Sequence, residues 1–281
     1  MEFYEAVGSR RSIRWFRPWE PVSVAMIQCV LEAARLVSCP GNVQPWRAVV
    51  VVQKEMPEGD REVLLDAGNR QWPQVLAPVW IYWFGDPDAA VPAAFVERVL
   101  ELLPTGAPPS SFGWTEQTVR ASIEDGHPMP PGLPPLEAVL HGMPYEFSAL
   151  FAAQETNGAC QVAQLAAIEE GLGTCLLSVS HPARQGDVKR VLGVPERFVP
   201  VWLQLLGHPA ESREAGGQRP RLSYEETYAW GRWGTPFPRD PDVVEDLTRR
   251  RLLQAPAPLP GRFEELAHLA RMFGIGEETA S

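Results

Sequence analysis

The sequence predicts a fold of the α+β class, in which a few short strands are combined with longer helices. Two observations predict it: several apolar runs have the length of buried strands, and the segments around them show helical periodicity. The chain has 281 residues, 45% of them hydrophobic, so it can bury a large core. Length alone permits one large domain or two modest ones.

An amphipathic helix is expected over residues 22–37, where apolar side chains recur at three- and four-residue steps. Pro21 suits the first position of this helix, and the Cys-Pro-Gly sequence at 39–41 ends it. The other elements expected in the first half are a strand at 47–53, a helix at 57–67 and a strand at 78–84.

The second half continues the same mixture of elements. Residues 147–171 predict a helix whose second half is apolar or small nearly all round, so it is buried or lies in a subunit interface. The elements expected after it are a strand at 174–180, a helix at 183–193, a strand at 198–207 and an amphipathic helix at 263–275. The Pro-rich tail after Trp233 either packs on the body or embraces another subunit.

Residues 86–146 differ from the rest because Pro and Gly interrupt them, leaving one helical piece at 93–103. The stretch is either a disordered linker or an excursion over the core. Large aromatic side chains are costly to leave in water, so Phe112, Trp114 and Tyr145 favour a lid over a pocket. We therefore expect these three side chains to contact a substrate.

Composition excludes several classes of protein. The net charge is −10, from 25 Lys and Arg against 35 Asp and Glu, which argues against a general nucleic-acid surface. No apolar run approaches the roughly 20 residues that span a bilayer, and the first residues do not resemble a signal peptide. The four cysteines and five histidines show no metal-ligand spacing. We expect a cytoplasmic protein with free thiols and no metal.

Positive charge is nevertheless concentrated in the sequence RRSIR, where Arg10, Arg11 and Arg14 surround Ser12. One interpretation is a solvated basic turn. The other is an anion clamp, because guanidinium groups offer forked donors and each charge-assisted hydrogen bond contributes about 1.5–3 kcal/mol when shielded from water.

Two further segments carry polar side chains that could bind the same ligand. Arg219 and Arg221 are two residues apart, a spacing that projects both side chains to one side of an extended chain, so they could join the first cluster around one phosphate. Asn42 and Gln44 follow a turn between a helix and a strand, where their amides either satisfy the local backbone or contact the polar edge of a flat heterocycle.

The sequences RRSIRWF, PGNVQPWRAVVV, GLGTCLLSVS, VLGVPERFVPVWLQLLGHP and RPRLSYEE occur in this order, and together they resemble the FMN-dependent nitroreductase family. The resemblance covers roughly residues 3–85 and 147–230. It implies an interlocked α+β homodimer with a central, mostly antiparallel sheet flanked by helices and with FMN at the subunit interface. The chain would then be one domain, residues 1–281, with an insertion at about 86–146 and a C-terminal extension at about 234–281.

The resemblance also implies a role for the arginines. Arg10, Arg11 and Ser12 would hold the phosphate end of FMN together with Arg219 and Arg221. These residues match the family's motif positions, so the anion clamp becomes the favoured interpretation.

Arg14 matches a position where the family has a basic residue beside the pyrimidine end of the flavin ring. Negative charge collects there on reduction. A contact that stabilises the reduced flavin by about 1–3 kcal/mol would raise its two-electron potential by roughly 20–60 mV.

Other matches lie around the flavin ring. Asn42 and Gln44 belong to a segment that, in the family, reaches the flavin from the partner subunit, and Gln71 matches a side chain near the polar edge of the ring. Ser178 and Val179 lie where the family supplies a backbone N–H near the reactive flavin nitrogen.

One departure from the family concerns Ser38 and Cys39, which stand where the family usually has Pro-Ser. The thiol of Cys39 would therefore lie among the cofactor contacts, either as a small packing residue or as a redox partner of the flavin. The GLGTC sequence at 171–175 is too short for a dinucleotide fingerprint and follows a helix, so a Rossmann site is not indicated.

The activity implied by the resemblance is hydride transfer from NAD(P)H through FMN to a small organic acceptor, such as a nitroaromatic or a quinone. One open flavin face serving both substrates implies ping-pong kinetics. A specialised flavin dehydrogenase or oxidase of a biosynthetic pathway is a second possibility, which the long insertion favours. A flavin-binding or storage protein without turnover is a third. The acidic, tyrosine and lysine trio of the deiodinase branch is not found on the insertion, which disfavours that branch.

Overall fold

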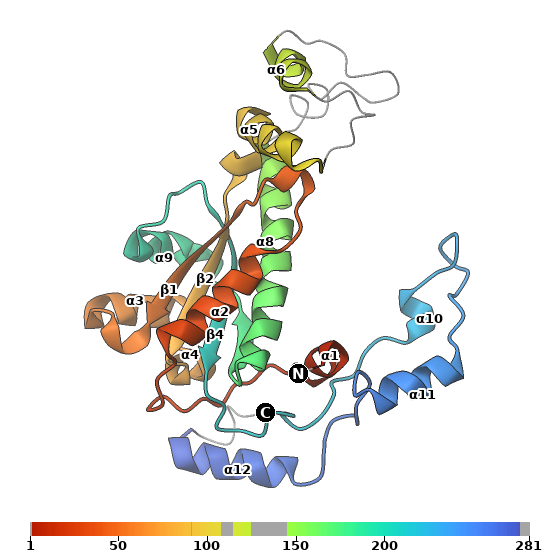
Figure 1. Cartoon of the computed structure of the whole chain (residues 1–281). Coiled ribbons are helices and arrows are strands. Elements are labelled where there is room, and N and C mark those ends of the chain that lie inside the picture. Colours follow the sequence, from red (N-terminus) through yellow and green to blue (C-terminus); the bar gives the residue numbers. More distant parts are fainter. Residues whose placement is uncertain (1, 91, 108–114, 125–144, 276–281) are drawn as a thin grey trace.

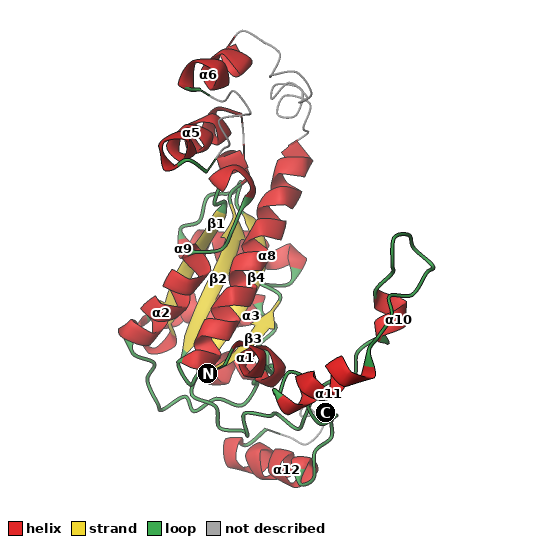
Figure 2. Cartoon of the chain, turned by 45° about the vertical axis from the view of Figure 1, so that its right-hand side comes forward, coloured by secondary structure: helices red, strands yellow, loops and turns green. Residues whose placement is uncertain are grey.

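The computed structural model describes residues 2–90, 92–107, 115–124 and 145–275. In these ranges four strands form an antiparallel sheet in the order β1-β2-β4-β3, with helices packed on it (Figures 1 and 2). The strands are β1 (Trp46–Val52), β2 (Val79–Gly85), β3 (Gly173–Leu177) and β4 (Val199–Gly207). The predicted α+β class, with a small antiparallel sheet flanked by helices, is confirmed.

Strand β2 is the centre of the core. All seven of its residues are buried, because it pairs with β1 on one side and β4 on the other and is covered on both faces. Trp80, Tyr82 and Phe84 belong to one hydrophobic cluster, whereas Ile81 and Trp83 belong to a second cluster across the sheet. The alternation follows from the two-residue period of a strand.

Helices α2 (Val24–Arg35) and α8 (Tyr145–Glu169) cover the second cluster. Small residues of α8, among them Ala159 and Ala163, let the two helices approach, with Val30 packed into the same cluster. Helix α8 runs along most of the length of the sheet (Figure 1). Its nearly uniform small and apolar surface, predicted from the sequence, is therefore partly used within the chain.

The opposite face of the sheet is covered by shorter elements from three parts of the chain. They are α3 (Glu58–Ala67), α4 (Trp72–Leu76), α9 (Gln185–Leu192) and the C-terminal helix α12 (Arg262–Phe273). Leu269 and Ala270 of α12 are buried in the first hydrophobic cluster. Of the two placements predicted for the tail, its last helix packs on the body of its own chain.

Several predicted boundaries need correction. Helix α2 begins at Val24, because the Ser23 side chain accepts a hydrogen bond from the Met26 amide and caps the helix, so the prediction that Pro21 is its first residue was wrong. Strand β3 ends at Leu177 rather than at residue 180, since the chain turns there and the His181 amide binds a carbonyl outside the sheet. Helices α1 (Phe3–Ser9) and α11 (Pro241–Arg249) were not predicted.

The described parts of the insertion are helical. Helix α5 (Pro92–Leu102) and helix α6 (Glu116–Glu124) share a small apolar cluster that includes Val99 and Val119, and α5 also contacts the Pro40–Asn42 turn. Phe112 and Trp114 lie outside the described residues. Within the described part of the chain, no helix is both long and apolar enough to cross a bilayer.

Candidate functional site

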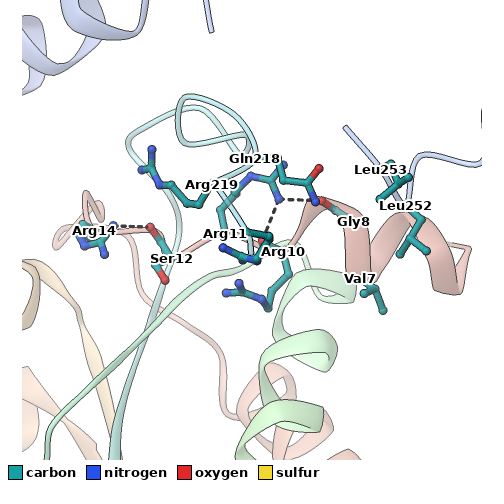
Figure 3. A pocket seen from close by; sticks show the side chains of 11 residues that line it. Val7, Gly8, Arg10, Arg11, Ser12, Arg14, Gln218, Arg219, Leu252 and Leu253 are labelled. Carbon is teal, nitrogen blue, oxygen red and sulfur yellow. Dashed lines mark hydrogen bonds between the residues drawn. The ribbon is translucent and has the colours of Figure 1, made fainter. Parts of the chain in front are cut away.

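A cavity of about 450 Å³ opens beside α1, and its walls come from three parts of the sequence (Figure 3). The residues that line it are Val7, Gly8, Arg10, Arg11, Ser12, Arg14, Gln218, Arg219, Arg221, Leu252 and Leu253. The structure thus brings together the two arginine segments that the sequence suggested for one anion, although they are about 200 positions apart.

The segment after α1 is extended and lies beside β3. The Ile13 amide donates to the Thr174 carbonyl at 2.9 Å, and Ser12 forms a parallel bridge with Thr174. Because side chains of an extended segment alternate, Ile13 and Trp15 are buried whereas Ser12 and Arg14 face the cavity. The same alternation fixes which residues of RRSIR can meet a ligand.

Glu211 fixes the backbone of this segment through hydrogen bonds. Its carboxylate accepts hydrogen bonds from the Arg14 amide at 2.6 Å and the Trp15 amide at 3.1 Å. The other carboxylate oxygen pairs with Arg262 at 2.6 Å, and both side chains of this ion pair are buried. A buried carboxylate with two amide donors and a guanidinium partner is fully compensated, so it is a rigid support for the cavity wall.

Arg11 lines the cavity, but its guanidinium is hydrogen-bonded to groups of the protein. It is buried, and its guanidinium donates to the carbonyls of Gly217, Gly8 and Arg10 and to the side-chain oxygen of Gln254, at 2.7–3.0 Å. Burial is the largest cause that lowers its pKa, followed by the charge of Arg10. Most of its N–H groups are thus directed back into the protein.

Arg10 differs from Arg11 in that its guanidinium has no partner among the described residues. It is half-buried, yet its side chain makes no hydrogen bond or ion pair to any described residue. Burial lowers its pKa, and the nearby charge of Arg221 lowers it further. A partly desolvated cation next to a second cation is stabilised when an anion joins them, so Arg10 is a candidate contact for an anionic ligand.

The remaining cavity arginines contact only backbone carbonyls. Arg14 donates to the Ser12 carbonyl at 3.3 Å, Arg219 to the Ala215 carbonyl at 3.2 Å and Arg221 to the Pro220 carbonyl at 3.0 Å. No carboxylate among the described residues pairs with any of them. Their charges are therefore available to a ligand, and a phosphate group fits this donor set.

Asn42, Gln44 and Cys39 do not line this cavity. They lie in and around the turn that contacts α5, at the end of α8 far from α1 (Figure 1). Asn42 and Gln44 have positive φ angles of 55° and 49°, and their side chains hydrogen-bond each other at 2.8 Å. Positive φ at Gln44 stores backbone strain, which is more common at binding sites than elsewhere.

The Cys39 thiol accepts a hydrogen bond from the Gln44 amide at 3.2 Å. Burial is the main cause that raises its pKa, so the thiol stays protonated at neutral pH. A protonated thiol that accepts a hydrogen bond from a neighbouring amide is compatible with a packing residue, the first of the two interpretations that the sequence left open.

Gln71 and Ser178 lie in neighbouring loops. The His181 amide donates to the Ala67 carbonyl at 2.9 Å, which joins the two loops, and the Gln71 side chain donates to the Gly68 carbonyl. Ser178 is exposed, whereas Val179 belongs to the hydrophobic core. Of these two candidates for a contact near a flavin ring, Ser178 is the one that faces solvent.

Aromatic packing on one side and strand β3 on the other connect these loops to the RRSIR segment. Trp15, which follows Arg14, packs on Trp72 with ring centroids 4.3 Å apart, and Trp72 follows Gln71. Along the other side, Ser12 bridges Thr174 of β3, and Ser178 comes four residues after Thr174, about 13 Å farther in an extended chain. Gln71 and Ser178 are thus connected to the Arg14 end of the cavity through Trp72 and β3, although neither lines the cavity.

Tyr145 begins α8 and is half-exposed, with its hydroxyl donating to the Arg197 carbonyl at 3.3 Å. It lies at the end of α8 that carries α5, not at the cavity (Figures 1 and 2). Among the described residues, no group of three His, Cys, Asp or Glu side chains is placed to hold a metal ion.

Comparison with known proteins gives this geometry its context. The model of the nitroreductase family matches residues 7–80 and 143–208, about half of the chain. This chain belongs to the nitroreductase family. The matched residues include the RRSIR segment and β3, although they stop before the arginines at 219 and 221.

Solved structures of other nitroreductase-family proteins have the same fold. A nitroreductase from Exiguobacterium sibiricum in complex with FMN superposes with a TM-score of 0.61 at 22% identity, covering 82% of this chain and 97% of that one. A family protein from Streptococcus pneumoniae gives 0.59 at 22% identity, covering 82% and 100%. An NAD(P)H:FMN oxidoreductase from Staphylococcus epidermidis gives 0.61 at 15% identity, covering 82% and 95%.

Among curated proteins, iodotyrosine deiodinase 1 of Rattus norvegicus is 31% identical over 80 residues. The match covers 28% of this chain and 28% of the deiodinase, so this nitroreductase-family chain aligns with little more than a quarter of that protein.

Sequence reasoning missed part of the cavity in this nitroreductase-family chain. Gln218, Leu252 and Leu253 line it, and Glu211 supports it, but none belongs to a motif quoted above. Gln218 precedes Arg219 and could have been suspected from that proximity. Leu252 and Leu253 give no local signal, because only the return of the tail to α1 brings them to the cavity.

Proposed function

We propose that this nitroreductase-family protein binds FMN and uses it to pass electrons from NAD(P)H to a small organic acceptor, such as a nitroaromatic or a quinone. The observation that carries the proposal is the cavity around Arg10, whose arginine charges meet no carboxylate among the described residues. A phosphate monoester supplies the missing negative charge. The relative that was solved in complex with FMN supports this choice of ligand.

The phosphate of FMN would be held by Arg10, Ser12, Arg219 and Arg221. Arg10 is half-buried at one wall, whereas Arg219 and Arg221 are exposed and can close on a ligand from the other wall. Arg11 serves this site mainly by holding the backbone of Arg10 through its hydrogen bond to that carbonyl. This refines its predicted role as a direct phosphate contact.

FMN, when bound, supplies the hydride chemistry, and the protein supplies placement and charge. Arg14 is exposed beyond Ser12, on the side of the cavity toward Gln71 and Ser178. Its guanidinium would stabilise negative charge at the pyrimidine end of the ring, and its backbone amide is held by Glu211. Because Trp15 and Trp72 pack together directly behind it, the residue is attached to a rigid part of the core.

A homodimer with the cofactor between subunits is part of the proposal. Asn42 and Gln44 are separated from the arginine cavity by the length of α8, so only a second copy could bring them to a ligand bound there. Large apolar side chains are exposed on helices α1 and α8 and on the segment that follows α10, for example Phe3 at 67%, Leu150 at 56% and Trp233 at 81%. Exposed apolar area of this extent favours a subunit interface.

The segment at 222–240, which includes α10 (Tyr224–Thr227), projects from the body and suits the embrace of a partner (Figure 2). Trp230 and Trp233 are 60% and 81% exposed on this arm. Sedimentation of the wild-type chain should give twice the chain mass, and Trp233→Ser should shift the equilibrium toward the monomer. A monomeric wild type that still binds FMN tightly would refute the shared site.

We further propose that the chain is a single domain, with the insertion at about 86–146 and the C-terminal extension at about 234–281 attached to it. All four cysteines are free, which favours the reducing environment of the cytoplasm. Limited proteolysis should cleave within the insertion before it cleaves the core. Separate thermal transitions for two parts of the chain would contradict a single domain.

The decisive experiment is an absorbance spectrum of the purified protein, followed by anaerobic addition of NADH or NADPH. A bound flavin spectrum that bleaches supports both the cofactor and the hydride-accepting half-reaction. A colourless protein that fails to bind added FMN would overturn the proposal. Steady-state rates with both substrates varied should give parallel lines in double-reciprocal plots, whereas intersecting lines would contradict the ping-pong order.

A further inference from the structure

The C-terminal extension takes part in the arginine cavity, although it lies outside the family match. That match ends at residue 208, whereas Leu252 and Leu253 line the cavity together with Val7 of α1 (Figure 3). The cavity therefore has a cationic side, to which the matched RRSIR segment contributes, and an apolar side, to which the unmatched extension contributes Leu252 and Leu253.

The backbone of the extension packs closely against the backbone of two segments that form the cavity. A Cβ atom added to Gly8 would clash with the Arg251 carbonyl and with Leu252, and one added to Gly217 would lie 2.9 Å from the Ala257 amide nitrogen. Such close approach requires glycine at both positions. The segment at 251–257 is therefore packed directly against α1 and against the loop that precedes Arg219.

Hydrogen bonds fasten the same two segments together. The Gln218 amide donates to the Ala255 carbonyl at 2.9 Å, and the Ala257 amide donates to the Gln218 carbonyl at 2.9 Å. The Leu259 amide donates to the Gly216 carbonyl at 2.7 Å, and the Gln254 amide donates to the Gln218 side chain at 3.0 Å. The position of Arg219 thus depends on the extension.

Gln254 links the extension to the RRSIR segment. Its side-chain oxygen accepts a hydrogen bond from Arg11 at 3.0 Å, and it is the only side-chain acceptor of Arg11 among the described residues. The opposite end of that guanidinium donates to the Arg10 carbonyl at 3.0 Å. Gln254 therefore acts on Arg10 through Arg11, and it does not itself line the cavity.

The first residue of α12 provides a second link. Arg262 pairs with Glu211, and Glu211 holds the amides of Arg14 and Trp15. Both ends of the RRSIR segment are thus tied to the extension, at Arg11 by Gln254 and at Arg14 by Arg262.

We propose that residues 251–262 of the C-terminal extension form part of the anion site, in which Gln254 is a positioning residue that holds Arg10 toward the phosphate of the ligand. The identity of that ligand as FMN rests on the function proposed above. The positioning role itself requires only that the ligand carries a phosphate group.

The test compares Gln254→Leu with Gln254→Glu. The leucine variant removes the acceptor of Arg11, whereas the glutamate variant keeps an oxygen acceptor at the same reach. Gln185→Leu on α9 is a matched control, because the Gln185 side chain makes no hydrogen bond to the described residues and does not line the cavity. Each protein is stripped of flavin and titrated with FMN and, separately, with riboflavin, which has no phosphate.

We expect Gln254→Leu to weaken FMN binding about tenfold, the effect of losing one hydrogen bond to a charged group, and to leave riboflavin binding unchanged. Gln254→Glu should restore most of the FMN affinity, and Gln185→Leu should match the wild type. A general structural defect would weaken both flavins alike. Equal FMN affinity of Gln254→Leu and wild type, or equal loss for FMN and riboflavin, overturns the proposal.

Thermal unfolding with and without inorganic phosphate separates this inference from the proposed function. If wild type binds neither flavin but phosphate raises its midpoint more than that of Gln254→Leu, the positioning role stands and the flavin function fails. If wild type binds FMN and both proteins respond equally to FMN and to phosphate, the function stands and the positioning role fails.

Discussion

Two groups of arginines in this chain have opposite surroundings. Around the buried carboxylate of Asp86, Arg47 and Arg197 each form an ion pair at 3.3 Å, and the charges are balanced within the protein. At the cavity, Arg10 and Arg221 lie near each other with no carboxylate partner among the described residues. The first group is explained by the fold alone, whereas the second fits the anion-binding role proposed above.

The largest effect on stability is expected at Glu211, which pairs with the buried Arg262 and also holds the backbone of the cavity residue Arg14. Glu211→Ala should lower the free energy of unfolding by about 3–5 kcal/mol, because it removes the buried one of the two carboxylate partners of Arg262 and leaves two backbone amides without their acceptor. Denaturant unfolding measures this. Glu214→Ala is the control, since Glu214 is exposed and its side chain makes no hydrogen bond to the described residues; a similar loss in both variants would contradict the support assigned to Glu211.

The second effect tests the unpaired group directly. Arg10→Ala should raise the dissociation constant for FMN by about 10- to 150-fold, the equivalent of about 1.5–3 kcal/mol for a charge-assisted contact to phosphate. The free energy of unfolding of the flavin-free protein should not fall, because no hydrogen bond within the chain is lost. Calorimetric titration and denaturant unfolding of one preparation measure both quantities. Lower stability with unchanged affinity would make Arg10 a structural residue.

For the arginines paired with Asp86, a substitution should lower stability and leave FMN affinity unchanged. Arg197→Ala removes one of the two ion pairs of Asp86 and should lower the free energy of unfolding by about 1 kcal/mol, because Arg47 still compensates the buried carboxylate. Its FMN affinity should equal that of the wild type. If Arg197→Ala and Arg10→Ala lowered stability and affinity in the same proportion, the distinction between the two groups would be wrong.

The sequence was sufficient for the parts of the site that are local in the chain. Arg10 to Arg14 and Arg219 to Arg221 could be grouped because charge clustering in an acidic chain is visible without a structure, and the order of the motifs fixed the family. The core strands were found for a similar reason: β2 is buried on both faces and therefore reads as a continuous apolar run.

Contacts made by distant segments could not be predicted. Nothing near Leu252 or Gln254 indicates that the tail returns to α1, because this depends on the packing of α12 and on the close approach at Gly8. The division of labour between Arg10 and Arg11 was also invisible. Adjacent arginines in an extended segment point in opposite directions, and only the carbonyls around Arg11 show which one is held by the protein.

The smallest effect concerns Glu265, which completes the paired arrangement of Arg262. Burial alone would raise the pKa of Glu265, but the Ser212 amide at 2.5 Å and the Arg262 guanidinium at 2.8 Å outweigh it, so its pKa is lowered on folding. A lowered folded-state pKa means that the stabilisation is present above the unfolded-state value of about 4.3 and is lost as the pH falls through the folded-state value.

Glu265→Gln should therefore cost below about 1 kcal/mol of unfolding free energy at pH 7, and the difference from wild type should shrink between about pH 5 and pH 3. Denaturant unfolding across this range measures it, with Glu264→Gln as the control, because Glu264 is exposed on the same turn and its side chain makes no hydrogen bond to the described residues. A difference that does not change with pH would mean that Arg262 is not shared between Glu211 and Glu265. Helix α12 would then be connected to the cavity only through the ion pair between Arg262 and Glu211. The arginines around Asp86 would be the remaining paired arginines with which the unpaired arginines of the cavity can be compared.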